Sequence, residues 1–295
     1  MPEAFGFLPV DKPLGMTSHA VVAAVRRGIR MKRVGHGGTL DPLATGVLVV
    51  CIGTATRLSE YVMHTRKRYL AQVRLGATTE TDDAEGQISA EQPIDQLTET
   101  AVAAALAAFN GETDQIPPMY SAIKQGGQKL YMLARRGETV ERPPRRVWMQ
   151  VRLVRYAAPH AELMVECSAG TYIRSLARDL GAALGVGGYL AGLRRLASGS
   201  FEQPIAWDAL QAAFAEGNWA RYLLDERAAL PHLPEVSLNA TQTEAIRHGR
   251  AIPAQNGADG TLARLYAASG AFLAIAACHA ETWQPVKVFH VDQES

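Results

Sequence analysis

The sequence predicts an α+β fold built on a mixed sheet. Two observations support this class: short apolar or alternating runs typical of strands, and separate segments with apolar residues at helical spacing. Strands and helices interspersed along one chain favour such an arrangement. The chain has 295 residues, of which 47% are hydrophobic, and this is enough for one large domain plus a small one.

The first part of the chain holds three expected elements. A helix covers residues 18–30, with Ser18 as its N-cap. Residues 46–53 are short, apolar and β-branched, which predicts a buried strand. Residues 69–75 alternate, so Tyr69 lies with apolar residues on the inner face of a half-buried strand.

Three more elements follow the same rules. Thr98 begins a helix that Asn110 and Gly111 end. Residues 162–167 alternate and predict a second half-buried strand. Residues 173–184 have apolar side chains at helical spacing and predict another helix.

The remaining segments suggest how the chain is divided. Residues 111–146 are rich in proline, glycine and bases, with one short helical candidate at 129–136, and so long an excursion is usually functional or mobile. Residues 201–234 are expected to be a connector with small helices. Residues 235–295 are strand-rich and near the lower end of domain size.

Charge is distributed in blocks that cancel to a formal net charge of +1. Residues 12–40 hold six basic side chains and no acidic one, and residues 124–155 hold nine basic and two acidic. Residues 75–123 hold nine acids and no base, and residues 225–295 hold eight acids and five bases. A basic block is the footprint of phosphate contacts. The alternative is a solvated surface with acidic neighbours in space.

Several classes of protein are excluded. No apolar run approaches the length of a membrane span, and Asp11 and Lys12 lie where a signal peptide would need apolar residues. The cysteines Cys51, Cys167 and Cys278 are too widely spaced for a disulfide framework or a CxxC zinc site. We therefore expect a soluble, cytoplasmic, globular protein.

Candidate reactive residues and glycines are most concentrated in VGHGGTLDPLATGVLVV, residues 34–50. Its glycines allow a ligand to approach the main chain closely, and Pro42 favours an extended conformation at Asp41. The spacing of a P-loop or a dinucleotide-binding loop is absent. Either Asp41 caps a tight turn through its own side chain, or it is a reactive carboxylate.

The residues alone do not decide which side chain acts together with Asp41. His36 is close in sequence, but a lone histidine is more often structural. The acidic run at residues 80–86 lacks EF-hand spacing and is expected to be a solvated turn. Asp41 with Asp83 could form a glycosidase-like pair of carboxylates. Arg174 could pair with a carboxylate, whereas Tyr172 and Tyr69 are core residues by default.

Six segments taken in order resemble the TruB family of bacterial tRNA pseudouridine synthases, almost continuously from residue 5 to about residue 200. The segments are DKPLGMTS (11–18), GHGGTLDPLATGVL (35–48), KRYLAQVRLGATTETDDAEG (67–86), PPMYSAIKQGGQKLYMLARRG (117–137), CSAGTYIRSLARDLG (167–181) and LRRLASG (193–199). Over the last 60 or so residues the resemblance is weaker.

The resemblance implies a pseudouridine synthase catalytic domain over residues 1–234, with a mobile thumb at about 117–146 and a connector at about 201–234. A small β-rich, PUA-like RNA-binding domain would follow over 235–295. The implied activity isomerises the T-loop uridine conventionally numbered 55 in tRNA, by base flipping, glycosidic cleavage, uracil rotation and C5–C1′ bond formation. We expect a monomer that binds the tRNA T stem-loop and needs no cofactor, metal, membrane or obligate protein partner.

The resemblance also assigns roles to eight residues. Asp41 matches the catalytic aspartate, Arg174 its ion-pair partner and Asp83 an acid in the same network. Tyr69 matches the tyrosine that stacks on the flipped base. Tyr172 and Leu193 match residues that line the uracil pocket. His36 matches the histidine that helps evict the uridine, and Lys12 falls in an element that supports the active-site floor.

Two further expectations come from this assignment. Pairing with Arg174 should lower the pKa of Asp41 and keep the carboxylate ionised. Which chemical step Asp41 performs first stays open. A tRNA-folding chaperone and a guide-RNA-dependent relative, as in archaea and eukaryotes, are the rival functions. The intact thumb segment favours the stand-alone enzyme.

Overall fold

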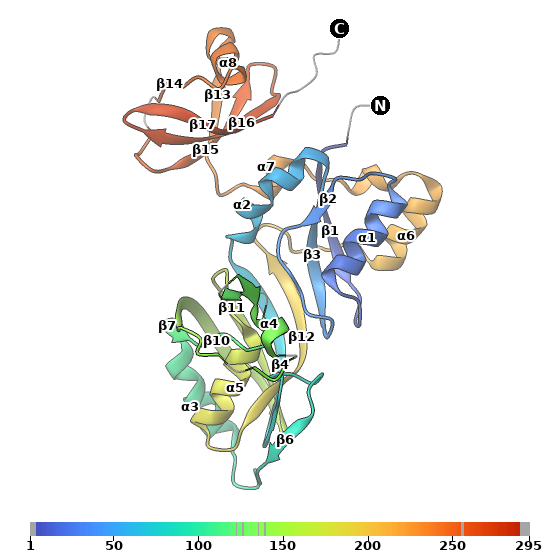
Figure 1. Cartoon of the computed structure of the whole chain (residues 1–295), viewed down its shortest axis with the longest axis vertical. Coiled ribbons are helices and arrows are strands. Elements are labelled where there is room, and N and C mark those ends of the chain that lie inside the picture. Colours follow the sequence, from blue (N-terminus) through green and yellow to red (C-terminus); the bar gives the residue numbers. More distant parts are fainter. Residues whose placement is uncertain are drawn as a thin grey trace.

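The computed structural model describes residues 4–121, 123–125, 127–134, 136–138, 140–254 and 257–289. Its centre is an eight-stranded sheet with the order β1-β3-β12-β4-β11-β10-β7, and β2 pairs with β3 (Figure 1). β12 pairs with β3 in parallel, and the other neighbours in this sheet are antiparallel. The predicted mixed, mainly antiparallel sheet is confirmed.

The strands of this sheet are β1 (Gly6–Lys12), β2 (Val34–His36), β3 (Ala44–Ile52), β4 (Lys67–Leu75), β7 (Gly111–Gln115), β10 (Arg145–Ala157), β11 (His160–Cys167) and β12 (Gly188–Ser198). Two hairpins accompany it: β5 (Ala77–Thr79) with β6 (Ile88–Glu91), and β8 (Lys124–Gln125) with β9 (Gln128–Lys129). The α-helices before the second sheet are α1 (Ser18–Gly28), α2 (Ser59–Met63), α3 (Glu99–Leu106), α4 (Leu130–Ala134), α5 (Ile173–Ala183), α6 (Trp207–Glu216) and α7 (Glu226–Ala229). The 3₁₀ helices are η1 (Gly53–Leu58), η2 (Ala107–Phe109) and η3 (Trp219–Tyr222).

One face of the sheet packs against helices in two groups. α1 and α6 lie beside β1 and β3, whereas α3 and α5 lie beside β4, β10 and β11 (Figure 1). Both groups bury apolar side chains in one continuous core, which includes the inner row of β4 at Tyr69, Ala71 and Val73. The alternation predicted for residues 69–75 is therefore confirmed, because burial of one face requires this period of two.

The two halves of the sheet separate beside β12. This strand pairs with β3 at Leu193, Arg194 and Arg195, whereas its pairing with β4 begins earlier, at Gly188. The sheet therefore splits just before Ala44, where β3 begins. The loop that leads into β3 lies at the split.

Ser18 does not cap its helix. The N-cap of α1 is Thr17, whose side chain accepts a hydrogen bond from the Ala20 amide at 3.0 Å. Ser18 is instead buried, donating to the Leu40 carbonyl at 2.9 Å and accepting from the Leu40 amide at 2.8 Å. The prediction was wrong because a long-range pair of hydrogen bonds uses this hydroxyl, and that pair ties α1 to the loop before β3.

The segment 111–146 is more ordered at its start than expected. Residues Gly111–Gln115 form β7, the edge strand that pairs with β10. Beyond it, the described residues contain the short β8–β9 hairpin and α4, which falls within the helical candidate at 129–136. Backbone pairing along the sheet edge outweighs the poor strand propensity of GETDQ.

A second sheet follows the connector, with the order β13-β15-β16-β17-β14. Its elements are β13 (Glu235–Leu238), α8 (Ala240–Arg247), β14 (Ile252–Pro253), β15 (Leu262–Ala267), β16 (Phe272–His279) and β17 (Thr282–Val288). The strand-rich character expected for residues 235–295 is confirmed over the described part. The domain boundary at residue 234 stays a prediction.

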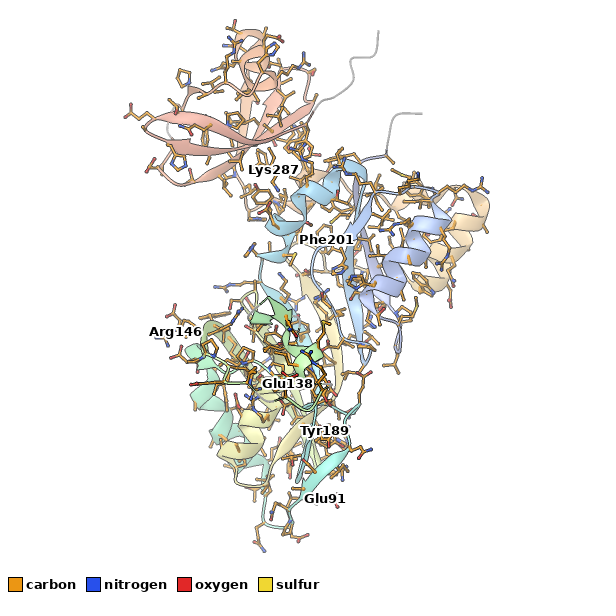
Figure 2. All side chains as sticks on the ribbon, viewed as in Figure 1. Glu91, Glu138, Arg146, Tyr189, Phe201 and Lys287 are labelled. Carbon is orange, nitrogen blue, oxygen red and sulfur yellow. The ribbon has the colours of Figure 1, made fainter. Side chains whose placement is uncertain are left out.

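The second sheet contacts the other face of β3. Tyr266, Phe272 and Phe289 share a buried apolar cluster with Val47 and Val49. Polar contacts surround this cluster at its edge, where Lys287 reaches the carbonyl of residue 57 at 2.5 Å (Figure 2). The apolar contact fixes the second sheet against the first. Within the described chain, no helix is both long enough and apolar enough to cross a membrane.

Candidate active site

Asp41 lies in the loop between β2 and β3, at the split in the sheet. Its Oδ2 atom lies 3.1 Å from Nε of Arg174, which extends from the first turn of α5. The Asp41 side chain is 37% exposed, whereas that of Arg174 is 7% exposed. The arrangement is an accessible carboxylate held by a buried cation. The alternative in which Asp41 only caps a turn loses its support, because the carboxylate binds a distant guanidinium.

Arg174 connects three parts of the chain. Its Nη1 lies 3.4 Å from Oδ2 of Asp83, and its Nη2 donates to the carbonyl of Tyr120 at 2.7 Å. Asp83 is 2% exposed and also accepts from the Thr81 hydroxyl at 2.5 Å. The expectation that residues 80–86 form a solvated turn is wrong at Asp83, because the buried guanidinium requires a buried counter-charge.

Burial raises the pKa of Asp41 above its ordinary value of 3.8. The Arg174 guanidinium opposes this shift, and the Asp83 carboxylate adds to it. Arg174 therefore lowers the pKa of Asp41 as expected, but burial outweighs this contribution and the net shift is upward. The desolvation of Asp41 outweighs a cation whose charge is shared with a second carboxylate.

Lys12 supports the loop from below. Its side chain is fully buried, and its Nζ donates to the carbonyls of Pro13 at 2.9 Å, Met16 at 2.5 Å and Pro42 at 3.3 Å. Burial lowers the pKa of Lys12, and the charge of Asp41 opposes that shift. With the Ser18–Leu40 pair, this ammonium fixes the chain on both sides of Asp41.

Tyr69 and Leu193 lie on adjacent strands in front of this loop. Tyr69 is 9% exposed on β4, opposite Arg195 of β12, and burial raises the pKa of its hydroxyl. Leu193 pairs with Ala44 on one side and Ala71 on the other. Both side chains therefore belong to the row that faces the helices.

Tyr172 is held at the start of α5 by the edge strand β7. Its amide donates to Oε1 of Gln115 at 2.8 Å, and Nε2 of Gln115 donates to its carbonyl at 3.0 Å. Burial raises the pKa of the Tyr172 hydroxyl, and the charge of Asp41 adds to that shift. Tyr172 is therefore close enough to Asp41 to belong to the same site.

His36 ends β2, on the chain segment that leads to Asp41. Its ring packs edge-on against that of His19, with 5.5 Å between centroids. Burial lowers the pKa of His36, and the neighbouring His19 and Arg195 lower it further. A neutral ring follows from these surroundings, with a buried Nδ1 that has no hydrogen-bond partner among the described residues.

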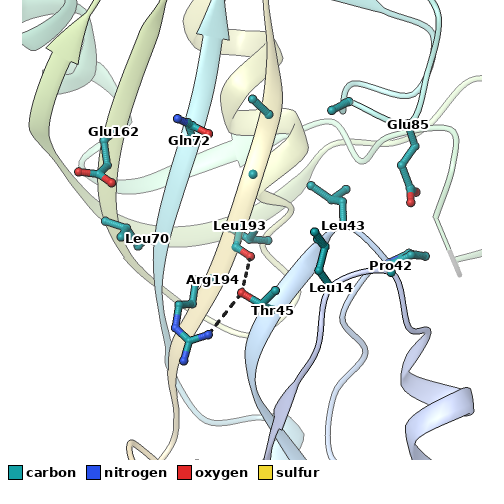
Figure 3. A pocket seen from close by; sticks show the side chains of 14 residues that line it. Leu14, Pro42, Leu43, Thr45, Leu70, Gln72, Glu85, Glu162, Leu193 and Arg194 are labelled. Atoms are coloured by element: carbon teal, nitrogen blue, oxygen red, sulfur yellow. Dashed lines mark hydrogen bonds between the residues drawn. The ribbon is translucent and has the colours of Figure 1, made fainter. Parts of the chain in front are cut away.

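A cavity of about 630 Å³ adjoins the loop (Figure 3). Its wall includes Pro42 and Leu43, which directly follow Asp41, together with Leu193. Glu85 also lines it, and burial raises the pKa of that carboxyl. Asp41 does not line this cavity, and neither do Tyr69, Tyr172 or Arg174.

Sequence reasoning missed Arg195. This side chain is 2% exposed, and its guanidinium donates to the carbonyls of Val47 at 2.6 Å, Gly38 at 3.1 Å and Thr39 at 3.4 Å. The alternation of a strand places Arg195 on the same face as Leu193. An arginine on that inward face was the available signal, since a buried guanidinium must find acceptors.

The gathered residues define the chemistry that this site can perform. A partly exposed carboxylate held by a buried guanidinium can act as a nucleophile or a base. The described residues contain no cluster of three or more His, Cys, Asp or Glu able to hold a metal ion. Of the eight sequence-assigned residues, His36 and Asp41 belong to the loop 36–43. Arg174 and Lys12 contact that loop directly, and Asp83 joins them through Arg174.

Comparisons with known proteins identify the class. The model of the "TruB family pseudouridylate synthase (N terminal domain)" matches residues 26–173, half of the chain, which places the chain among the pseudouridine synthases. Models of a tRNA pseudouridylate synthase B C-terminal domain and of a TruB C-terminal domain match residues 174–229 and 234–289. The chain belongs to the TruB family, as the sequence predicted.

Curated relatives agree with this placement. A tRNA pseudouridine synthase B of Dehalococcoides mccartyi is 44% identical over 96% of each chain. One from Thermobifida fusca is 45% identical, covering 97% of this chain and 99% of its own. A solved Cbf5-Nop10-Gar1 complex contains a chain that is 27% identical, with a TM-score of 0.75, over 97% of this chain and 84% of that one. An H/ACA RNP chain at 24% identity and a TM-score of 0.76, covering 98% of this chain and 86% of its own, shows the fold alone.

Proposed function

We propose that this enzyme isomerises the T-loop uridine of tRNA, conventionally position 55, to pseudouridine, with Asp41 as the reacting carboxylate. The observation that carries the proposal is the accessible Asp41 carboxylate fixed on the buried Arg174 at the split in the sheet. The relatives named tRNA pseudouridine synthase B support tRNA as the substrate.

The reaction breaks the N1–C1′ bond, turns the uracil and joins C5 to C1′. N1 gains a proton and C5 loses one, so atoms balance and no electrons are gained or lost. Flipping the base out of a folded loop costs a few kcal/mol, and stacking on an aromatic ring returns about 1–3 kcal/mol. Tyr69 supplies that ring, on the strand that faces Asp41. Ionised Asp41 acts on the sugar or the base as nucleophile or base.

The surrounding residues fit the other steps. Tyr172 and Leu193 are assigned to the uracil pocket in this proposal. The ring of His36, kept neutral by burial, can occupy the place of the evicted base without the desolvation penalty of a charge. RNA recognition then depends on the shape of the loop and its unstacked bases.

The direct test is incubation with unmodified tRNA, followed by chemical mapping of pseudouridine. A single new pseudouridine in the T loop is the expected result. A matched tRNA with cytidine at that position should stay unmodified. Pseudouridine at another position, or none, contradicts the proposed substrate.

The pKa of Asp41 gives a pH dependence. Only the ionised carboxylate reacts, and burial raises its pKa above 3.8. The single-turnover rate should therefore fall as the pH decreases, with a midpoint above that of an ordinary aspartate. The decrease in rate should follow the titration of one proton. Binding of tRNA is measured separately at each pH. A midpoint below 3.8 would mean that Arg174 dominates over burial.

The thumb arginines should contact phosphates. Arg145 and Arg146 begin β10 and are exposed. Arg146 lies 3.6 Å from Asp114, and this exposed ion pair contributes little to stability. Reversing both charges with Arg145→Glu and Arg146→Glu should weaken tRNA binding and reduce the log–log salt slope by about one unit for each lost contact.

The control for this thumb variant is Arg221→Glu, which changes an exposed arginine in η3 of the connector. It should leave the log–log salt slope of tRNA binding close to that of the wild type. An unchanged slope in the double variant would show that both thumb arginines face solvent in the complex.

A further inference from the structure

Arg195 is buried without a carboxylate partner. It is among the largest fully buried side chains of the chain, and no ion pair among the described residues includes it. Its neighbour on β12, Arg194, points to the opposite face and pairs with Asp11 at 2.7 Å. Burying an arginine without a counter-ion is expensive. The guanidinium must therefore be held by the groups that accept its hydrogen bonds.

Those groups are main-chain carbonyls of two segments. One is Val47 in β3, at 2.6 Å from Nε. The others are Gly38 and Thr39, at 3.1 and 3.4 Å from the two terminal nitrogens. These last two residues lie directly before Leu40 and Asp41, so the guanidinium holds the chain just ahead of the reactive carboxylate.

The backbone is shaped to meet this side chain. Gly38 has a φ of 126°, a conformation that other residues rarely adopt. Gly46 in β3 lies so close to β12 that a Cβ there would come within 2.2 Å of the Arg195 carbonyl oxygen. Both glycines allow the loop and β3 to approach Arg195, as its short hydrogen bonds require.

We infer that Arg195 is a positioning residue for the reaction, which acts by fixing the carbonyls of residues 38 and 39 and thereby the aim of Asp41. The inference rests on the proposed role of Asp41. Arg195 differs from Arg174, which binds the carboxylate itself. Its planar fork holds carbonyls of two segments at fixed angles, and a lysine at this position would keep the charge but lose that geometry.

An effect of Arg195 through Tyr69 has to be distinguished from its effect through the loop before Asp41. Arg195 also lies opposite Tyr69 on the neighbouring strand, and its charge lowers the pKa of the Tyr69 hydroxyl, against the larger effect of burial. If the loop route is correct, Arg195→Lys should slow the reaction by the same factor in wild-type and Tyr69→Phe backgrounds. Loss of the Arg195 effect in the Tyr69→Phe background would overturn the inference.

The principal experiment compares Arg195→Lys with Arg194→Lys, its neighbour on the opposite face. A displacement of about 1 Å at a reacting group can reduce the rate about 10²-fold. We expect Arg195→Lys to lower the single-turnover rate by about this factor while the Kd for unmodified tRNA stays unchanged. Arg194→Lys should keep both values. A purely structural role for Arg195 would lower affinity and rate together, and that outcome overturns the inference.

Two further variants keep the test decisive. If Arg195→Lys fails to fold, Gly38→Ala perturbs the same contact from the loop side, because a Cβ there conflicts with a φ of 126°. It should slow the reaction without weakening tRNA binding, and a normal rate would overturn the inference. Asp41→Asn is measured alongside. An active Asp41→Asn enzyme refutes the proposed function, whereas an inactive one with a fully active Arg195→Lys enzyme refutes only this inference.

Discussion

Asp41→Asn should abolish pseudouridine formation, with a fall of more than about 10⁴-fold in the single-turnover rate, because removal of a reacting group has effects of this size or larger. The amide has the shape of the carboxylate but cannot ionise, so it supplies neither a nucleophile nor a base. Its oxygen can still accept a hydrogen bond from Arg174 Nε, which lies 3.1 Å away in the wild type. Folding should therefore be preserved.

The measurement pairs chemical mapping of the T loop with a tRNA-binding assay on the same preparation. Affinity close to that of the wild type is expected, because the RNA-binding surface is unchanged. Asp82→Asn is a suitable control, since that carboxylate pairs with Arg178 at 3.1 Å and not with Arg174. Substantial turnover by Asp41→Asn would refute the assignment of Asp41.

The same variant separates the enzyme from a tRNA-folding chaperone. A chaperone needs the binding surface but not the carboxylate. Refolding of a misfolded tRNA by Asp41→Asn at the wild-type rate would support that additional role, which stays a prediction. Complete dependence of refolding on Asp41 would count against it.

Local sequence patterns predicted the elements that form the site. The apolar run at 46–53, the alternation at 69–75 and the helical spacing at 173–184 correspond to β3, β4 and α5. These patterns reflect which face of an element is buried, so they are visible in a single sequence. The resemblance to a known family was needed to connect Asp41 with Arg174, because no local rule relates residues so far apart.

The errors share a physical cause. Ser18, the acidic run at 80–86 and the pKa of Asp41 all depended on groups that are distant in sequence. Ser18 binds Leu40, and Asp83 binds Arg174. Such contacts form only when the sheet and helices pack, and they override the local preference for a cap or a solvated turn. The contacts of Arg195 with the loop were missed for the same reason.

Arg174→Met should be the most destabilising single change in the site. The substitution removes the cation that lies 3.1 Å from Asp41 and 3.4 Å from Asp83. Breaking a buried pair by deleting one partner costs about 3–5 kcal/mol of unfolding free energy. The Asp83 carboxylate, 3% exposed, carries most of this penalty, since Asp41 is more than a third exposed and is screened by water.

The control is Arg178→Met, one turn further along α5. Arg178 pairs with Asp82 at 3.1 Å, but its side chain is 26% exposed. Its loss should cost less, about 1 kcal/mol, because a partly exposed pair is screened by water. Chemical unfolding of both variants gives the comparison, and equal destabilisation would show that the buried position of Arg174 has no special energetic role.

The pH dependence of this destabilisation tests its electrostatic origin. Without Arg174, the pKa of Asp41 should rise further, because the guanidinium is the main group that opposes burial. A carboxyl with a raised pKa in the folded state lowers stability only at pH values where the unfolded chain is ionised. The deficit of Arg174→Met should therefore be smallest at acidic pH and grow as the pH increases through the pKa of an unfolded aspartate. A deficit independent of pH would assign it to lost packing of the arginine stem, because neutral contacts do not titrate.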